Sequence, residues 1–429
     1  MREKPTDANP ATKLTDIMTR LYRNRYTTTS GGNLSVKSED GNVYITPGSL
    51  DKGALREEHI VRIAPTGEKV GIAPPSCEWP FHLNIYKIHP EYTAIVHAHP
   101  GVLMGYSLAH RVPRVEAFPL VWDSGKIAVA GYGAPGSERL MTCVGEAFRG
   151  DITAAIMTNH GAVVGHTDGL EAAYSRFEDL IFCAECENAS LRWNSGLNIP
   201  SDSESNRLKE FFAPEEECLP AGTEMFWAER GTLTHWIRRA YEQRLLLSRH
   251  GTISLRVGED AFLINRRDED RAEVSEKDLV LVSGGKMYGG QADATWQLHR
   301  DIYLANPALN AAFTAYCPNI MGVLAGDKLM DTDCMPESFI VLHSLPAATI
   351  GQFLDDPRSV TGRISAKQHI SCLKNGFVLT AGSSLKEAFD TLEVAEFSAQ
   401  AALEAAVQGG VCPLPNADVE EMRQLFGID

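Results

Sequence analysis

Features that would place this chain in a membrane or outside the cell are missing from its sequence. No apolar run in the 429 residues approaches the roughly 18 residues that a membrane-spanning helix needs. The opening MREKPTDANPATK is polar and holds no apolar signal segment, so we expect no secretory signal. The 9 cysteines are odd in number and scattered, unlike a disulfide framework. We therefore expect a cytoplasmic protein with no membrane partner.

Positive charge is also scarce. The 40 Lys and Arg residues are outnumbered by 56 Asp and Glu, which gives a net charge of -16. A nucleic-acid surface needs a basic balance, so we expect no nucleic-acid partner. Cys183 and Cys186 have CxxC spacing, but they lie in a helical pattern with no second pair, which disfavours a zinc or redox role for them.

The sequence does contain a long internal repeat. Three segments recur in the same order in its two halves, and this indicates a duplicated domain. The matched pairs are SCEWPFHLNIYKIHPEYTAIVHAHPG (76–101) with DATWQLHRDIYLANPALNAAFTAYCPN (293–319), NHGAVVGHTDGLEAAYSRFE (159–178) with KNGFVLTAGSSLKEAFDTLE (374–393), and GGNLSV (31–36) with HGTISL (250–255). The first pair needs one extra residue in the second copy, after Pro307 and before Pro318 is matched with Pro100.

The repeat sets the domain organisation. We predict a first domain over 1–200, a linker or arm over 201–222, and a second domain over 223–429. Alternating strands and helices predict a layered α/β domain around a mixed sheet. The elements predicted for the first copy are a helix over 11–25, strands at NLSVK, NVYIT and IVRI, a helix from near Glu78, a strand through His97, a helix after Gly101, strands near 125–130, a helix from Ser137, the strand AAIMT, and a helix over 168–190.

Polar residues differ between the copies where the scaffold does not. His97 and His99 are two apart in a strand pattern, so both side chains point to one face. In the sequence alignment the counterparts of four polar residues are Ala315 for His97, Cys317 for His99, Asn375 for His160 and Thr295 for Glu78. Structural histidines have no reason to vanish together, so these four residues predict one site, present in the first copy and lost from the second. His82 recurs as His299, which favours a scaffold role for it over a metal ligand.

Three histidines and a carboxylate are typical of a Lewis-acidic metal site. This ligand set suits Zn²⁺, and imidazole and carboxylate groups also admit Mn²⁺, Co²⁺, Ni²⁺ or Fe²⁺. Glu78 begins a predicted helix, where an acidic residue also favours the helix dipole. The loss of Glu78 together with the histidines favours a functional role, as a metal ligand and general acid/base.

With these residues, the first copy closely resembles the class II aldolase/adducin family over residues 10–195. The motifs that carry the resemblance are GGNLS (31–35), ITPGS (45–49), PSCEWPFH (75–82), HAHP (97–100) and NHG (159–161). The second copy resembles the same family with its metal motif erased, as in adducin head domains. The resemblance implies two tandem three-layer α/β/α domains, each around a mixed or mainly antiparallel sheet.

The resemblance also implies roles for individual residues. His97, His99, His160 and Glu78 match the metal ligands, and Glu78 matches the acid/base. The residues that match the family's substrate-phosphate site are Asn33, Thr46, Gly48, Ser76 and Cys77. Two of these motifs depart from the usual pattern, because ITPGS has Gly48-Ser49 in reversed order and SCE has Cys77 where a second serine is common.

A third departure concerns a proton donor. Family aldolases carry a tyrosine about twenty residues after the HxH pair, where this chain has Phe118, followed by Trp122 and Asp123. Tyr132 or a residue of the second copy could replace that tyrosine. The resemblance implies a zinc-dependent aldolase that cleaves a sugar phosphate or related hydroxy-carbonyl compound through a metal-stabilised enediolate. The alternatives are a 4-epimerase, dehydratase or decarboxylase of the same family, or a non-catalytic metal-binding or scaffold protein.

The duplication implies an assembly as well. Single-domain family members form rings of four with active sites between neighbours. Two fused copies per chain would therefore build a homodimer that mimics such a ring. We expect a small-molecule substrate and this homo-oligomer as the partners of the chain.

Overall fold

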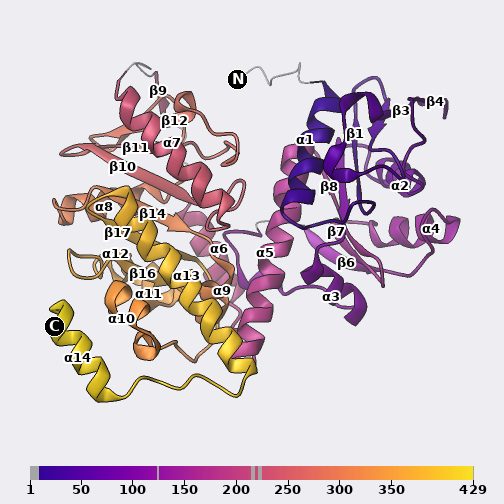
Figure 1. Ribbon diagram of the computed structural model, residues 1–429. Coiled ribbons are helices and arrows are strands. Elements are labelled where there is room, and N and C mark those ends of the chain that lie inside the picture. The colour runs from indigo at the N-terminus through magenta and orange to yellow at the C-terminus, as the bar shows by residue number, and fades with distance from the viewer. Residues whose placement is uncertain (1–8, 123–124, 214–217, 221–224, 429) are drawn as a thin grey trace. The chain divides into compact units, whose positions relative to one another are not determined.

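The computed structural model describes residues 9–122, 125–213, 218–220 and 225–428, and it divides into two compact units (Figure 1). The first unit comprises Met1–Pro113 and Asp123–Ala184, and the second comprises Arg114–Trp122 and Glu185–Asp429. Within the described ranges no helix combines the length and the apolar character that crossing a bilayer requires.

The first unit contains the elements predicted from the hydrophobic pattern. Its helices are α1 (Pro10–Arg23), α2 (Trp79–Ile88), α3 (Gly101–Ala109), α4 (Glu138–Ala147) and α5 (Leu170–Asn194), the last of which continues into the second unit. Its strands are β1 (Asn33–Lys37), β2 (Val43–Ile45), β3 (Val61–Ile63), β4 (Lys69–Val70), β5 (Ala94–Ala98), β6 (Lys126–Ala130), β7 (Ile152–Met157) and β8 (Gly161–His166). The strands β4 and β8 are additional to the prediction.

These strands form one sheet in the order β4-β3-β2-β1-β5-β8-β7-β6. Neighbours are antiparallel except β6 and β7, which are parallel, so the predicted mainly antiparallel sheet is confirmed. The strand β5 lies between β1 and β8, and His97 at its end stands opposite Asn33 on β1 and Val163 on β8. This register brings β1, β5 and β8 together around His97 and Asn33.

Helices cover both faces of the sheet, as Figure 1 shows for α2 and α4 on one side and α1 on the other. Phe81 and Ile85 of α2 pack with Val144 of α4 against Ile95 and Val163, all buried. Side chains two apart on a strand share a face, so His97 lies on the same face as Ile95, under α2. The edge-on contact of Phe81 with the His97 ring, at 5.5 Å between centroids, agrees with this.

The second unit repeats this architecture. Its helices are α6 (Asp202–Phe211), α7 (Trp227–Glu242), α8 (Trp296–Ala305), α9 (Pro318–Leu324), α10 (Pro336–Leu342), α11 (Ile350–Asp355), α12 (Arg358–Thr361), α13 (Leu385–Val407) and α14 (Asn416–Phe426). Its strands are β9 (Cys218–Leu219), β10 (Thr252–Gly258), β11 (Ala261–Asn265), β12 (Leu279–Ser283), β13 (Lys286–Tyr288), β14 (Ala311–Ala315), β15 (Ala347–Ala348), β16 (Ile370–Leu373) and β17 (Phe377–Gly382), in the order β15-β16-β17-β14-β10-β11-β12-β13-β9. The segment predicted as a linker holds α6 and β9.

Strand register corrects the sequence alignment of the two copies by one residue. Asn33 stands opposite His97 in the first unit, and its counterpart Thr252 stands opposite Thr314 in the second. The position of His97 is therefore taken by Thr314 and not by Ala315. The alignment was wrong because it placed the extra residue of the second copy before this strand.

The extra residue follows the strand instead. The backbone N–H of His99 donates to Tyr26 O at 3.1 Å, and the N–H of Tyr316 donates to the corresponding Leu245 O at 3.2 Å. Tyr316, and not Cys317, thus takes the place of His99. Alignment by identity had matched the prolines and ignored the backbone pairing that fixes the register.

The hairpin that carries His160 is also misaligned by one residue, in the opposite direction. The N–H of His160 donates to Met157 O at 3.0 Å, and the N–H of Gly376 donates to Leu373 O at 3.0 Å. Gly376, and not Asn375, therefore stands at the position of His160. All three histidine positions still lose their imidazole in the second copy, so the conclusion drawn from the duplication is unchanged.

Candidate metal centre

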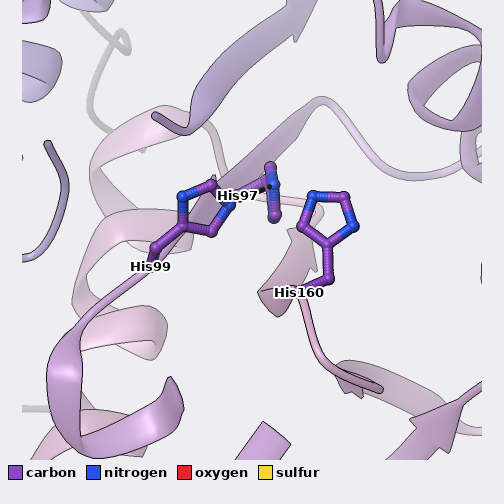
Figure 2. Close-up of side chains that lie close together, drawn as sticks. All are labelled: His97, His99 and His160. Atoms are coloured by element: carbon purple, nitrogen blue, oxygen red, sulfur yellow. Dashed lines mark hydrogen bonds between the residues drawn. The ribbon is translucent and has the colours of Figure 1, made fainter. Parts of the chain in front are cut away.

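Three histidines from two neighbouring strands converge in the first unit (Figure 2). His97 lies on β5, His99 directly follows this strand, and His160 lies in the turn between β7 and β8. One ring nitrogen from each lies within 4.8 Å of the others, and the Nε2 atoms of His97 and His99 are 3.1 Å apart. The spacing of the three nitrogens suits a single small ion.

The hydrogen bond of His97 orients its ring for this role. Its Nδ1 lies 2.9 Å from Ala162 O, and a carbonyl can only accept, so Nδ1 carries the proton. Nε2 then carries the lone pair, and it faces the other histidines, as in histidines that bind metal. Burial, with the neighbouring His97 and His160, lowers the pKa of His99 to about 3, which keeps that ring neutral as a ligand must be.

Glu78 completes the cluster from the residue before α2. Its Oε2 lies 3.2 Å from His97 Nε2 and its Oε1 lies 2.8 Å from His160 Nε2. Burial by itself raises the pKa of Glu78, but the adjacent His97 and His160 outweigh it and hold the pKa well below its usual range. Glu78 is therefore an anion, 5% exposed, beside the imidazoles of His97 and His160.

These four residues fit a divalent ion. A buried carboxylate and inward-facing imidazole lone pairs leave the cluster rich in electron donors, and a cation is what relieves that arrangement. The residues that would hold the ion are His97, His99, His160 and Glu78. Imidazole and carboxylate donors suit Zn²⁺ and also Mn²⁺, Co²⁺, Ni²⁺ or Fe²⁺.

Two glycines give the histidine rings their room. A Cβ on Gly161 would lie 2.5 Å from His99 Cδ2, and a Cβ on Gly31 would lie 2.7 Å from His99 Nδ1. Real Cβ atoms do not approach this closely, so any side chain at either position would displace the ring. The GGN and NHG motifs therefore serve the site through their glycines as well as through their polar residues.

Asn33 is the predicted substrate-binding residue closest to the cluster. Its Nδ2 donates to Glu78 Oε2 at 2.7 Å, and its Oδ1 lies 2.5 Å from His82 Nε2. The amide therefore holds the carboxylate of Glu78, a contact that residue spacing could not show. Asn33 stands opposite His97 across the β1–β5 pairing, which explains the convergence.

Thr46, Gly48 and Ser76 are tied into the backbone around the cluster. Thr46 Oγ1 accepts from the N–H of Leu34 at 3.1 Å, and the N–H of Gly48 donates to Pro74 O at 3.1 Å. Ser76 Oγ accepts from the N–H of Glu78 at 3.3 Å. Thr46 and Ser76 are buried, and their hydroxyls can each donate one further bond.

Cys77 and Lys52 border the same region. Cys77 is an exposed residue, and partial desolvation of its thiol, with the neighbouring Glu78, raises its pKa. Lys52, which the sequence analysis missed, is 1% exposed and donates from Nζ to Pro47 O at 2.5 Å. Burial lowers the pKa of Lys52 to about 8, against the raising effect of Glu78 and Cys77.

Phe118, which this chain has where family aldolases have a tyrosine, is at a buried position. Phe118 is fully buried and belongs to Arg114–Trp122, a segment of the second unit. Trp122, at the end of this segment, is buried as well. Asp123 lies outside the described residues. Tyr132 is 48% exposed and lies in the loop after β6. The same loop passes close to Cys77, because a Cβ on Gly136 would lie 3.1 Å from Cys77 Cβ.

Comparison with known proteins gives consistent matches. A family model described as the class II aldolase and adducin N-terminal domain matches residues 12–187 and 232–403. A 3-oxo-tetronate 4-phosphate decarboxylase of Haemophilus influenzae is 34% identical over 164 residues, which is 36% of this chain and 75% of that protein.

Aldolases are similar as well. An L-fuculose phosphate aldolase of Escherichia coli is 29% identical over 196 residues, or 46% of this chain and 88% of that protein. A solved structure of an L-fuculose 1-phosphate aldolase matches with 26% identity and a TM-score of 0.43, covering 48% of this chain and 97% of its own.

Proposed function

The chain belongs to the class II aldolase and adducin family, and from this premise we propose that it is a divalent-metal-dependent lyase that cleaves a carbon–carbon bond of a phosphorylated hydroxy-carbonyl compound. The observation that carries the proposal is the convergence of His97, His99 and His160, with the carboxylate of Glu78 beside His97 and His160. Lyases occur among the relatives with similar sequences, and both aldolases and decarboxylases are present among them.

Each residue of the cluster has a distinct part in this chemistry. The histidines hold the ion, and a divalent ion when bound supplies Lewis-acid polarisation of a substrate carbonyl. Glu78 moves the proton, because its carboxylate is ionised and lies in the cluster. Asn33 holds Oε2 of that carboxylate through Nδ2, which leaves Oε1 on the side of His160.

Aldol cleavage is the lead reaction. The hydroxyl on the second carbon from the carbonyl loses its proton. The bond between this hydroxyl-bearing carbon and the carbon next to the carbonyl then breaks, and an aldehyde is released. The electron pair stays on the carbonyl fragment as an enediolate, which takes up a proton to give the second product. Glu78 is the group of this chain suited to transfer a proton in these steps, and zinc is the ion that we expect.

Decarboxylation is the second candidate. There the bond to a carboxylate breaks, CO₂ leaves, and the electron pair passes to the adjacent carbonyl before a proton is taken up. Two observations favour it, the 34% identity to a 3-oxo-tetronate 4-phosphate decarboxylase and the apolar Phe118 near the position of the aldolase tyrosine. Epimerisation and dehydration remain alternatives that use the same polarised carbonyl.

Metal content tests the metal dependence of the proposed enzyme and separates it from a scaffold that binds no metal. We expect the purified chain to hold about one divalent ion, measured by mass spectrometry of the elements. His97→Ala removes a ligand and should lose the ion. The matched control is Thr314→Ala, at the corresponding strand position of the second copy, which should keep it. Wild-type protein that takes up no divalent ion would sink the proposal.

Product analysis separates the two reactions. Phosphorylated ketoses are assayed for released aldehyde, and phosphorylated 3-oxo acids are assayed for released CO₂. Glu78→Gln keeps the shape of the side chain but removes its base, so turnover should fall by about 100-fold or more. Unchanged turnover in that variant would rule out Glu78 as the proton-transfer group, and its metal content shows whether the loss is one of binding or of chemistry.

A further inference from the structure

A chain of buried side chains runs from the packed core of the first unit to the carboxylate of Glu78. Ser35 Oγ lies 2.9 Å from the Tyr86 hydroxyl and 2.7 Å from His82 Nδ1. His82 Nε2 lies 2.5 Å from Asn33 Oδ1, and Asn33 Nδ2 lies 2.7 Å from Glu78 Oε2. All five residues are buried, so water does not compete for these bonds.

The carboxylate of Glu78 fixes the direction of every bond in this chain. An ionised carboxylate only accepts, so Asn33 must present its Nδ2 there and its Oδ1 to His82. Oδ1 only accepts, so the proton of His82 sits on Nε2. Burial lowers the pKa of His82 to about 3, so the ring is neutral and Nδ1 accepts from the Ser35 hydroxyl. Ser35 then has no proton left for Tyr86, so the Tyr86 hydroxyl donates toward Ser35, whose Oγ lies 2.9 Å and whose backbone O lies 3.1 Å away.

The second copy keeps the core part of this chain and lacks its end. Ser254 Oγ lies 2.7 Å from His299 Nδ1 and 2.6 Å from the Tyr303 hydroxyl, as in the first copy. His299 is also fully buried, but its Nε2 points to Thr314 Oγ1 at 2.8 Å. The Ser–His–Tyr group is therefore common scaffold, whereas its connection to an amide and a carboxylate belongs to the first copy alone.

We propose that His82 is a positioning residue of the metal centre, which acts on Glu78 through Asn33. Its Nε2–H fixes the Asn33 side chain so that Nδ2, and not Oδ1, meets Glu78. Without that donor the amide can turn, and a carbonyl oxygen facing the carboxylate repels it. His82 thus sets the place of Glu78 beside His97 and His160. The proposal deepens the function proposed above and rests on it.

Two substitutions of His82 separate its two hydrogen bonds. Gln reaches as far as Nε2 and can still donate to Asn33, whereas Asn reaches only as far as Nδ1 and leaves Asn33 without its donor. We expect His82→Asn to weaken Co²⁺ or Zn²⁺ binding by about 10- to 100-fold, the usual effect of losing a partner of a metal ligand, and to lower kcat more than it raises KM. His82→Gln should recover most of both.

His299 provides the matched control, because its burial and its Ser and Tyr partners are the same. His299→Asn should lower the melting temperature about as much as His82→Asn but leave metal affinity unchanged. Equal metal loss in both variants would overturn the proposal and show a purely structural role. Metal binding by His82→Asn at wild-type affinity, or a His82→Gln variant no better than His82→Asn, would overturn it too.

The metal titration needs no turnover, so it decides the role of His82 even if no substrate is cleaved and the proposed lyase function fails. A further measurement needs no metal. Imidazole ¹⁵N NMR of the metal-free protein should find the His82 proton on Nε2, with Nδ1 unprotonated. A proton on Nδ1 would overturn the inference, because Asn33 could not then be held as described.

Discussion

At the scale of single residues, the two copies share a buried cation. Lys52 donates to Pro47 O, and Arg271, its counterpart, donates to Arg266 O at 3.2 Å and twice to Gly251 O. The N–H groups of Arg271 donate to several backbone carbonyls, whereas Lys52 donates one N–H of its ammonium group to Pro47 O. A buried cation that donates to backbone carbonyls at this place is thus common to both copies. In the first copy the charge of Lys52 also interacts with Glu78 and Cys77.

The lowered pKa of Lys52 predicts a pH-dependent stability. Burial lowers this pKa from 10.5 to about 8, so between these values the unfolded chain binds more protons than the folded one. The free energy of unfolding must then rise with pH across this window, by up to about 3 kcal/mol. Lys52→Met lacks the rise. Urea denaturation of metal-free wild type and variant measures the difference, and parallel pH curves would contradict the prediction.

At the scale of elements, the hairpin of β7 and β8 sets the third ligand against the first two. Gly161 opens β8, where its backbone passes the ring of His99. Antiparallel pairing of β5 with β8 places Ala162 opposite Ala98, so the hairpin cannot shift without moving His160. The metal centre therefore depends on strand register, to which no single ligand residue points.

Gly161→Ala tests this dependence. The added Cβ would lie 2.5 Å from His99 Cδ2 and 2.8 Å from Ala98 O, so the ring must move. We expect metal affinity to fall by about 10-fold or more. Gly165→Ala, four residues further along β8, is the control, because its Cβ would meet the ring of Tyr92 at 2.4 Å. Both should lower the melting temperature, but a metal loss shared by both would speak against a specific effect.

At the scale of the whole molecule, one chain carries the candidate metal site and an altered copy of the same fold. The second copy preserves the buried scaffold, including the hydrogen-bonded Ser254 and His299, while Thr252 and Thr295 pair with each other at 2.9 Å where the first copy has Asn33 and Glu78. A neutral pair of threonines needs no cation to stabilise it. The fold of this copy thus persists without the metal chemistry.

We propose that the chain assembles as a homodimer, in which four related domains imitate a ring of four. The fused copies supply two domains per chain, so two chains complete the number. Light scattering should give a mass about twice the 47.0 kDa of one chain. A monomer at micromolar concentration would contradict the proposal, and the metal content of that monomer would still report on the metal centre.

The sequence by itself determined the duplication, most of the elements of the first copy and the four members of the His–Glu cluster. Residue identity was enough there, because a repeat within one chain reveals which polar residues are lost against a constant apolar scaffold. His97, His99, His160 and Glu78 come together in the structure as their joint loss predicted. The predicted substrate contacts of Asn33, Thr46, Gly48, Ser76 and Cys77 remain predictions.

Only the tertiary structure decided the register and the hydrogen bonds. Apolar strands such as β5 align equally well one residue apart by sequence, and backbone pairing alone showed that Thr314 replaces His97. The direction of a side-chain hydrogen bond depends on what lies across the sheet, so the contact of Asn33 with Glu78 and His82 was hidden in the sequence. Residue types state which chemistry a chain can perform, and strand register states which atoms meet to perform it.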